Sequence, residues 1–216
     1  MTEQTIEQRM SVCEVRALRN DERKVTTLEG RPIVFDQRTD LADADWDEII
    51  DKGALDNADL KDVRFLVNHD TNQLPLARSR NNNANSTMRI SVDDAGMLVE
   101  ADIDTDNNPR GQELASAVSR GDVSGMSFMF TINGDAWENL DADRPTRHIT
   151  SISRVYEVSA VTFPAYEQTS INVRSLESGR ASLESARKAL ESARRRSERI
   201  RELNQKLEDL NDKGIH

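Results

Sequence analysis

The chain is poor in cysteine, histidine and aromatic residues. Cys13 is its one cysteine in 216 residues, which excludes an internal disulfide and a zinc site built on cysteines. Its histidines are His69, His148 and His216, too few to favour a histidine metal site. We therefore predict no metal and no cofactor. With aromatic residues at 4% and hydrophobic residues at 36%, the core must be modest.

Long apolar runs are also missing. No stretch approaches the roughly 20 apolar residues of a membrane helix, so we predict no membrane contact. The first seven residues lack both the basic segment and the apolar segment of a secretory signal. These two absences predict a protein of the cytosol.

Acidic residues outnumber basic ones outside the C-terminal part. The net charge is −10, yet residues 175–216 are slightly basic, so residues 1–174 carry the acidic excess. Phosphate binding needs a basic surface, and this argues against nucleic acid as a partner. The run Arg194-Arg195-Arg196 is better explained as the solvated face of a helix.

Alternating apolar and polar residues predict a mostly β body with few helices. Strands are expected over residues 12–18, 25–35, 63–70, 74–80, 87–92, 97–103, 126–131 and 147–163. Helices are expected over residues 45–52, which begin with acidic side chains and stop at Gly53, and over residues 109–120, which begin at a proline. Residues 134–143 have the composition of an acidic linker.

The C-terminal part is a different kind of sequence. Three near copies of seven residues begin at Ser175, Ser182 and Ala189, with leucine in second place in each copy. The a and d positions of these heptads would form the contact line of a coiled coil, and half of them hold small residues. This pattern predicts a long helix that associates weakly. We therefore divide the chain into a domain of residues 1–174 and a helical tail of residues 175–216. Self-association, a partner and a freely solvated tail all remain open.

Ser127 sits in an unusual place. It lies among large apolar residues in Gly125-Met126-Ser127-Phe128-Met129-Phe130, just after a glycine. If Phe128 faces the core, Ser127 faces the other side of the strand. One interpretation is a hydroxyl that bonds to nearby backbone. The other is a nucleophile, which requires a base and an orienting group elsewhere in the chain.

His69 and Glu157 are candidates for those two roles. His69 ends a predicted buried strand, and an imidazole can take a serine proton near neutral pH. Glu157 lies on a predicted buried strand, where a carboxylate normally has a partner. Composition and spacing do not decide between a catalytic triad and unrelated surface or capping residues.

Four segments together resemble the prohead maturation proteases of tailed bacteriophages, serine peptidases with the assemblin fold of herpesvirus capsid proteases. In chain order they are Asn68-His69-Asp70, Asp94-Ala95-Gly96-Met97-Leu98, the segment from Gly121 to Phe130, and the segment from Glu157 to Ala165. The resemblance covers about residues 25–173. It differs at Met129, where the family often has glycine, and at Leu76-Ala77, where the family usually has Leu-Gly.

The resemblance implies that Ser127 is the nucleophile, His69 the base and Glu157 the third member of the triad. Ser124 is a second serine close by and ranks below Ser127. It also implies an α+β, mostly β fold, with a closed or nearly closed antiparallel barrel flanked by helices.

The implied function is that of a serine endopeptidase in the host cytoplasm, inside the assembling procapsid. Its expected substrates are the scaffold or the scaffold-like segment of the major capsid protein, and the enzyme itself. The helical tail would hold it to the scaffold or shell and be removed by self-cleavage.

Two alternatives stay open. One is a non-catalytic capsid assembly or scaffolding protein, for which Ser127 would be dispensable. The other is a β domain whose tail recruits an unrelated partner and whose triad is accidental.

Overall fold

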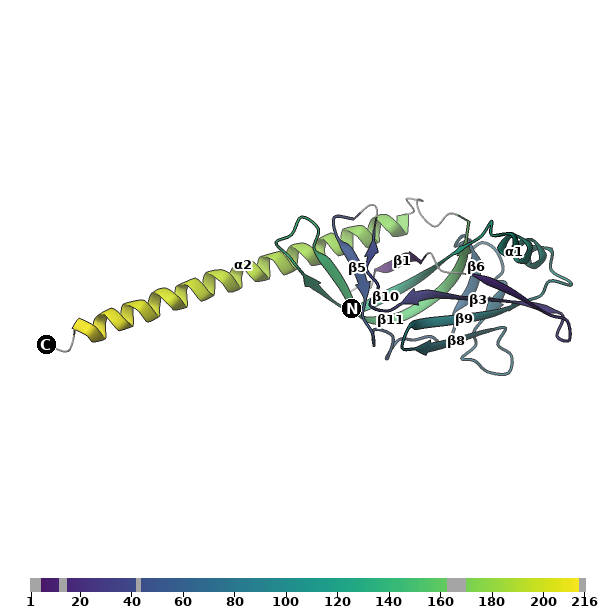
Figure 1. Ribbon diagram of the computed structural model, residues 1–216, viewed down its shortest axis with the longest axis horizontal. Helices are drawn as coiled ribbons and strands as arrows, with labels where there is room; N and C mark the ends of the chain where they lie inside the picture. Colours follow the sequence, from purple (N-terminus) through teal and green to yellow (C-terminus); the bar gives the residue numbers. More distant parts are fainter. Residues whose placement is uncertain (1–4, 12–14, 42–43, 163–169, 214–216) are drawn as a thin grey trace.

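The computed structural model describes residues 5–11, 15–41, 44–162 and 170–213 (Figure 1). They form two sheets and two helices. The larger sheet runs in the order β1 (Ile6–Ser11), β10 (Gly125–Glu138), β11 (Thr146–Val161), β5 (Asp47–Ile50) and β4 (Thr39–Asp40), with β6 (Arg64–Val67) paired to β11 and β7 (Ala77–Arg78) paired to β6. The smaller sheet runs β2 (Arg16–Asn20), β3 (Val25–Val34), β9 (Gly96–Ile103) and β8 (Met88–Asp93). The helices are α1 (Pro109–Arg120) and α2 (Ser170–Lys213).

The α+β, mostly β class is confirmed, but the closed antiparallel barrel is not found. Within the described ranges the larger sheet has β1 at one end and β4 at the other, and they do not pair with each other. The edge strands β4 and β7 have two residues each, too few hydrogen bonds to close a sheet. The sheet is also mixed, because both β5 and β6 pair with β11 in parallel.

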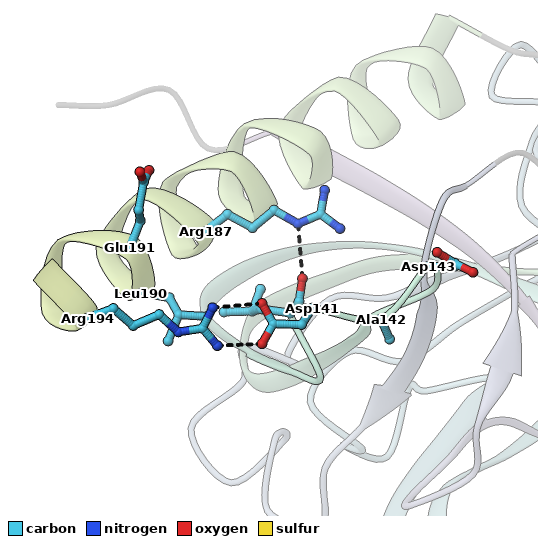
Figure 2. Close-up of a pocket in the computed structure, with 8 residues that line it drawn as sticks. Asp141, Ala142, Asp143, Arg187, Leu190, Glu191 and Arg194 are labelled. Atoms are coloured by element: carbon cyan, nitrogen blue, oxygen red, sulfur yellow. Dashed lines mark hydrogen bonds and ion pairs between the residues drawn. The ribbon is translucent and has the colours of Figure 1, made fainter.

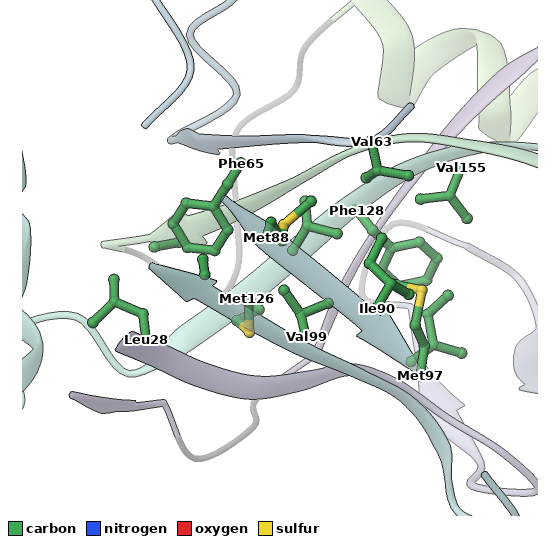
Figure 3. Close-up of a cluster of buried hydrophobic side chains, with 14 of the residues drawn as sticks. Leu28, Val63, Phe65, Met88, Ile90, Met97, Val99, Met126, Phe128 and Val155 are labelled. Carbon is green, nitrogen blue, oxygen red and sulfur yellow. The ribbon is translucent and has the colours of Figure 1, made fainter. Parts of the chain in front are cut away.

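The hydrophobic core lies between the two sheets. Strand β3 alternates buried and partly exposed residues, as expected for a strand with one face on the core. Its buried side chains meet those of β6, β8, β9, β10 and β11 (Figure 3). Phe128 and Phe130 belong to this core, and their ring centroids are 4.9 Å apart.

Local signals for the hairpin and for α1 are confirmed. Strands β8 and β9 pair directly, and Asp93 accepts hydrogen bonds from the backbone N–H groups of Ala95 and Gly96 in the turn. The Arg31 guanidinium, helped by these bonds, lowers the pKa of Asp93 to about 2. Helix α1 begins at the Asn108 cap and ends at Gly121, whose φ of 79° suits glycine.

The predicted helix over residues 45–52 is wrong, because this segment contains strand β5. Residues 47–50 pair in parallel with residues 146–149 of β11. Glu48, whose charge suggested the first turn of a helix, is 3% exposed and binds two arginines from β1 and β11. Long-range pairing overrides the local helix signal here.

Other segments also differ from the sequence prediction. Of the strand expected over residues 74–80, only Ala77–Arg78 is strand β7, and strand β1 was not predicted. The expected linker over residues 134–143 is strand β10 as far as Glu138, because β10 and β11 pair along a long hairpin. Of the strand expected over residues 12–18, residues 12–14 lie outside the described residues, and β2 begins at Arg16.

Helix α2 confirms the predicted C-terminal helix, and its first turns pack on the body. Ser175 is 1% and Leu183 is 7% exposed, whereas most side chains beyond them face solvent. Figure 1 shows the helix continuing away from the sheets. None of the described helices is long and apolar enough to span a membrane. The division of the chain between residues 174 and 175 stays a prediction.

A close contact at Gly179 attaches α2 to the body. A Cβ atom at this position would lie 2.5 Å from Cζ2 of Trp46, a side chain that is 0% exposed. We expect Gly179→Leu to destabilise the protein by about 1–3 kcal/mol through overpacking, measured by denaturant unfolding with tryptophan fluorescence. Ala189→Leu on the exposed part of the same helix is the control. Equal unfolding midpoints for the two variants would contradict this contact.

His148 makes the stability depend on pH. Its Nδ1 lies 2.7 Å from Oδ1 of Asp51, and its Nε2 lies 3.4 Å from Oε2 of Glu138. Burial lowers the pKa of His148, but the two carboxylates outweigh this effect and raise the pKa above 6.5. The protonated ring therefore stabilises the fold at low pH, and this contribution is lost as the pH rises through the raised pKa.

We expect the denaturant concentration at the midpoint of unfolding to decrease as the pH rises from about 6 to about 8. His148→Gln should flatten this dependence, because its side chain does not titrate. An unchanged slope in the variant would show that another group is responsible.

Candidate active site

A histidine and a carboxylate meet where β6 ends beside β11. Parallel pairing sets Leu66 next to Ser159, so the turn after β6 lies over the residues that follow Glu157. There Nδ1 of His69 lies 2.5 Å from Oε1 of Glu157. Glu157 is 3% exposed, so this contact is shielded from water and stronger than a surface pair. Two of the three predicted site residues are thus in direct contact.

Ser159 joins the same site, a residue that sequence reasoning did not select. Its hydroxyl donates to Oε2 of Glu157 at 2.6 Å and accepts the backbone N–H of His69 at 3.1 Å. Ser159 is fully buried. The available signal was its place two residues after Glu157, on the same face of the strand. Ser159 orients both the carboxylate and the histidine backbone.

The backbone at His69 is held in a conformation that is uncommon for residues other than glycine. The φ values of Asn68 and His69 are 49° and 57°. Two hydrogen bonds of Asn68 compensate. Its side-chain Oδ1 accepts the backbone N–H of Thr162 at 3.0 Å, and its backbone N–H donates to the Ala160 carbonyl at 2.9 Å. Such local strain is often retained where a side chain must be positioned for function.

Ser127 lies on the neighbouring strand and points to the same side of the sheet as Ser159. The two residues are directly opposed in the antiparallel pair of β10 and β11, and opposed side chains share a face. Ser127 is fully buried, and its Oγ donates to the backbone carbonyl of Arg9 in β1 at 2.8 Å. Ser124, by contrast, is exposed and precedes the strand.

No hydrogen bond joins Ser127 to His69 in this conformation. The Nε2 atom of His69 is buried and has no hydrogen-bond partner among the described residues. In this structure the second ring nitrogen of His69 is therefore unpartnered among the described residues, and the Ser127 hydroxyl is bonded to the Arg9 carbonyl.

One pocket lies remote from these residues. It has a volume of about 520 Å³ and lies between α2 and the turn that joins β10 to β11 (Figure 2). Asp141 of that turn binds Arg194 at 2.6 and 3.2 Å, and Arg187 donates to the Leu140 carbonyl at 3.2 Å. Ser127 and Glu138 are eleven residue steps apart on β10, which is roughly 35 Å of strand. The pocket therefore lies far from Ser127, between helix α2 and the β10–β11 hairpin.

The described side chains suggest no metal centre. Among them, no group of three or more His, Cys, Asp or Glu residues is arranged to hold a metal ion.

Comparison with known proteins identifies the family. Residues 12–182 match the family described as caudovirus prohead serine protease. The prohead protease of Enterobacteria phage HK97 is 27% identical over 164 residues, which cover 73% of this chain and 67% of that protein. No solved structure matches the chain. Because the family match covers most of its length, the chain belongs to the caudovirus prohead serine protease family and is a phage prohead maturation protease.

Proposed function

We propose that Ser127, His69 and Glu157 are the catalytic triad of this serine protease. The observation that carries the proposal is the buried contact of 2.5 Å between His69 and Glu157. Nε2 of His69 has no hydrogen-bond partner among the described residues, and Ser127 lies on β10, the other neighbour of the strand that carries Glu157. A nucleophile, a base and an orienting carboxylate are the parts that acyl transfer requires.

Each residue has one task in this mechanism. The Oγ of Ser127 attacks the carbonyl carbon of a peptide bond while Nε2 of His69 accepts the hydroxyl proton. Glu157 accepts the Nδ1–H bond and stabilises the imidazolium that forms. His69 then gives the proton to the leaving amine, and water hydrolyses the acyl-enzyme by the same route in reverse.

The Ser127 hydroxyl must first turn away from the Arg9 carbonyl. In enzymes without bound substrate, catalytic hydrogen bonds are often long or poorly aligned and tighten only in the active complex. The bond from Ser127 to Arg9 is therefore compatible with a resting enzyme.

The proposed substrates are the scaffold or the scaffold-like segment of the capsid protein, and the chain itself. The family supports a place inside the assembling procapsid in the host cell. The part of α2 that leaves the body exposes Ile200, Leu203 and Leu207, with exposed fractions of 51%, 52% and 60%. This apolar face supports a scaffold-binding or self-associating role for the tail before its removal. We also propose that the two-sheet body has an assemblin-like fold.

Co-expression with the phage's own capsid protein tests the nucleophile. We expect Ser127→Ala to lower capsid-protein cleavage by roughly 10³-fold or more, since a triad without its nucleophile loses nearly all its activity. Intact masses of the capsid protein and of the protease report both the cuts and any loss of the tail. Ser124→Ala is the matched control and should cleave like the wild type.

Each contrary outcome has a distinct meaning. Unchanged cuts in Ser127→Ala, with cuts lost in Ser124→Ala, would move the nucleophile to Ser124. Particles that assemble with uncut protein in every case would favour a non-catalytic assembly protein.

Ser159→Ala tests the positioning of the triad. The change leaves the His69 N–H and one Glu157 oxygen without the hydroxyl that satisfies them, which costs about 1–3 kcal/mol of stability. We expect cleavage to slow by about 10- to 100-fold because the imidazole is less well oriented. The surface change Ser91→Ala is the control. Wild-type cleavage rates in Ser159→Ala would remove Ser159 from the positioning role.

A further inference from the structure

Strand β1 lies along the strand that carries the nucleophile. Six residues of β1 pair antiparallel with β10, and Met10 is directly opposite Ser127. Within the described residues β1 is the outermost strand at this end of the sheet. An extended peptide that binds to a sheet edge makes this same arrangement. The edge of β10 next to Ser127 is therefore suited to a peptide strand and is occupied by the chain's own N-terminal segment.

Strand β1 accepts a hydrogen bond from the proposed nucleophile, Ser127. The Ser127 hydroxyl has one proton, and it donates that proton to the Arg9 carbonyl at 2.8 Å. It cannot at the same time donate to Nε2 of His69, which is buried without a partner among the described residues. Since Ser127 is also fully buried, a substrate cannot reach it while β1 is in place.

The side chain of Arg9 holds β1 in position. Its guanidinium binds Glu48 of β5 at 2.5 and 2.8 Å, Glu7 at 2.6 Å and the Ser175 hydroxyl of α2 at 2.8 Å. The guanidinium is also 5.8 Å from the centroid of the Phe130 ring. The anchor is thus a buried cluster of two carboxylates and two guanidinium groups, in which Arg147 of β11 also binds Glu7 and Glu48.

Several features make this attachment exchangeable. Buried ion pairs contribute little net stability, because the loss of hydration offsets their attraction. Gln8 of β1 has a buried Oε1 without a hydrogen-bond partner among the described residues, and Ile6 is 40% exposed. Of the apolar side chains of β1 that the structure describes, Ile6 is thus already partly in contact with water before the strand leaves.

A small cavity lies beside the Arg9 anchor. It has a volume of about 40 Å³, and its lining includes Arg9, Glu48, Ile50 and Phe128. Departure of Arg9 would enlarge this recess and leave Glu48 in its wall. An arginine or lysine in an incoming strand would restore the lost ion pair.

We propose that β1 is a resident occupant of the peptide-binding edge of β10. It covers Ser127 in the resting protein, and an extended substrate segment with a basic side chain at the position of Arg9 takes its place. This inference rests on the proposed role of Ser127 as nucleophile. It adds the class of substrate that binds beside Ser127 and the segment that blocks Ser127 in the resting protein.

A reversible cross-link tests the occupancy. Gln8 and Met129 are opposed in the pair of β1 and β10, so Gln8→Cys with Met129→Cys, in a Cys13→Ser background, places two thiols within disulfide range. We expect a serine-reactive fluorophosphonate to label the oxidised protein at least about 10-fold more slowly than the reduced protein. Cys13→Ser alone, with and without reductant, is the control and should show no difference. If the protein with the first pair of cysteines does not fold, Ile6→Cys with Thr131→Cys replaces it, because these two residues are also opposed in the pair of β1 and β10.

Matched peptides test the basic side chain. A synthetic peptide with the sequence of residues 5–12 and a copy with alanine for Arg9 compete with the fluorophosphonate on the full-length wild-type chain. We expect the arginine peptide to protect Ser127 at a concentration at least about 10-fold lower than the alanine peptide. Equal protection by both peptides would overturn the assignment of a basic side chain.

The outcomes separate this inference from the proposed function. Equal labelling of the oxidised and reduced protein, abolished by Ser127→Ala, would overturn the role of β1 and leave Ser127 as the nucleophile. Absence of labelling in every state, with cleavage retained by Ser127→Ala during co-expression, would overturn both.

Discussion

The pairing of β11 with its neighbours is the constraint on which the candidate site depends. This sixteen-residue strand pairs antiparallel with β10 and parallel with both β5 and β6. It carries Glu157 and Ser159 itself, and its pairing places Ser127 on one side and His69 on the other. A shift of one residue in either register would turn the side chains of a strand to the opposite face. The site therefore needs no loop to assemble it, apart from the two-residue turn at Asn68 and His69.

The sequence predicted the parts of the fold that depend on neighbouring residues. The β8–β9 hairpin and helix α1 follow from local turn and capping residues, and the structure confirms both. Strand β5 was predicted as a helix, because its partner in β11 is about one hundred residues away and no local feature reveals it. The mixed, open sheet was missed for the same reason. Alternation identifies a strand but does not specify its neighbour or its direction.

The site was predictable as a set of residue types and not as a set of contacts. The chemistry of serine, histidine and glutamate, together with the family resemblance, selected Ser127, His69 and Glu157. The contact between His69 and Glu157 agrees with that selection, and the catalytic role stays a proposal. Ser159 and the Arg9 carbonyl were missed because a bridging hydroxyl and a backbone acceptor have no sequence signature. Both become visible only when strands from distant parts of the chain lie together.

The projecting part of α2 has a mechanical consequence. At 1.5 Å per residue, the nineteen residues after Arg194 extend about 28 Å as a single helix. If the protease is attached through the far end of such a helix, the helix acts as a rigid spacer. A flexible linker would instead let its two ends approach each other. The peptide bonds that the attached protease can cleave then lie at a nearly constant distance from the point of attachment. Inside a closed shell, that geometry selects targets by their position as well as by their sequence.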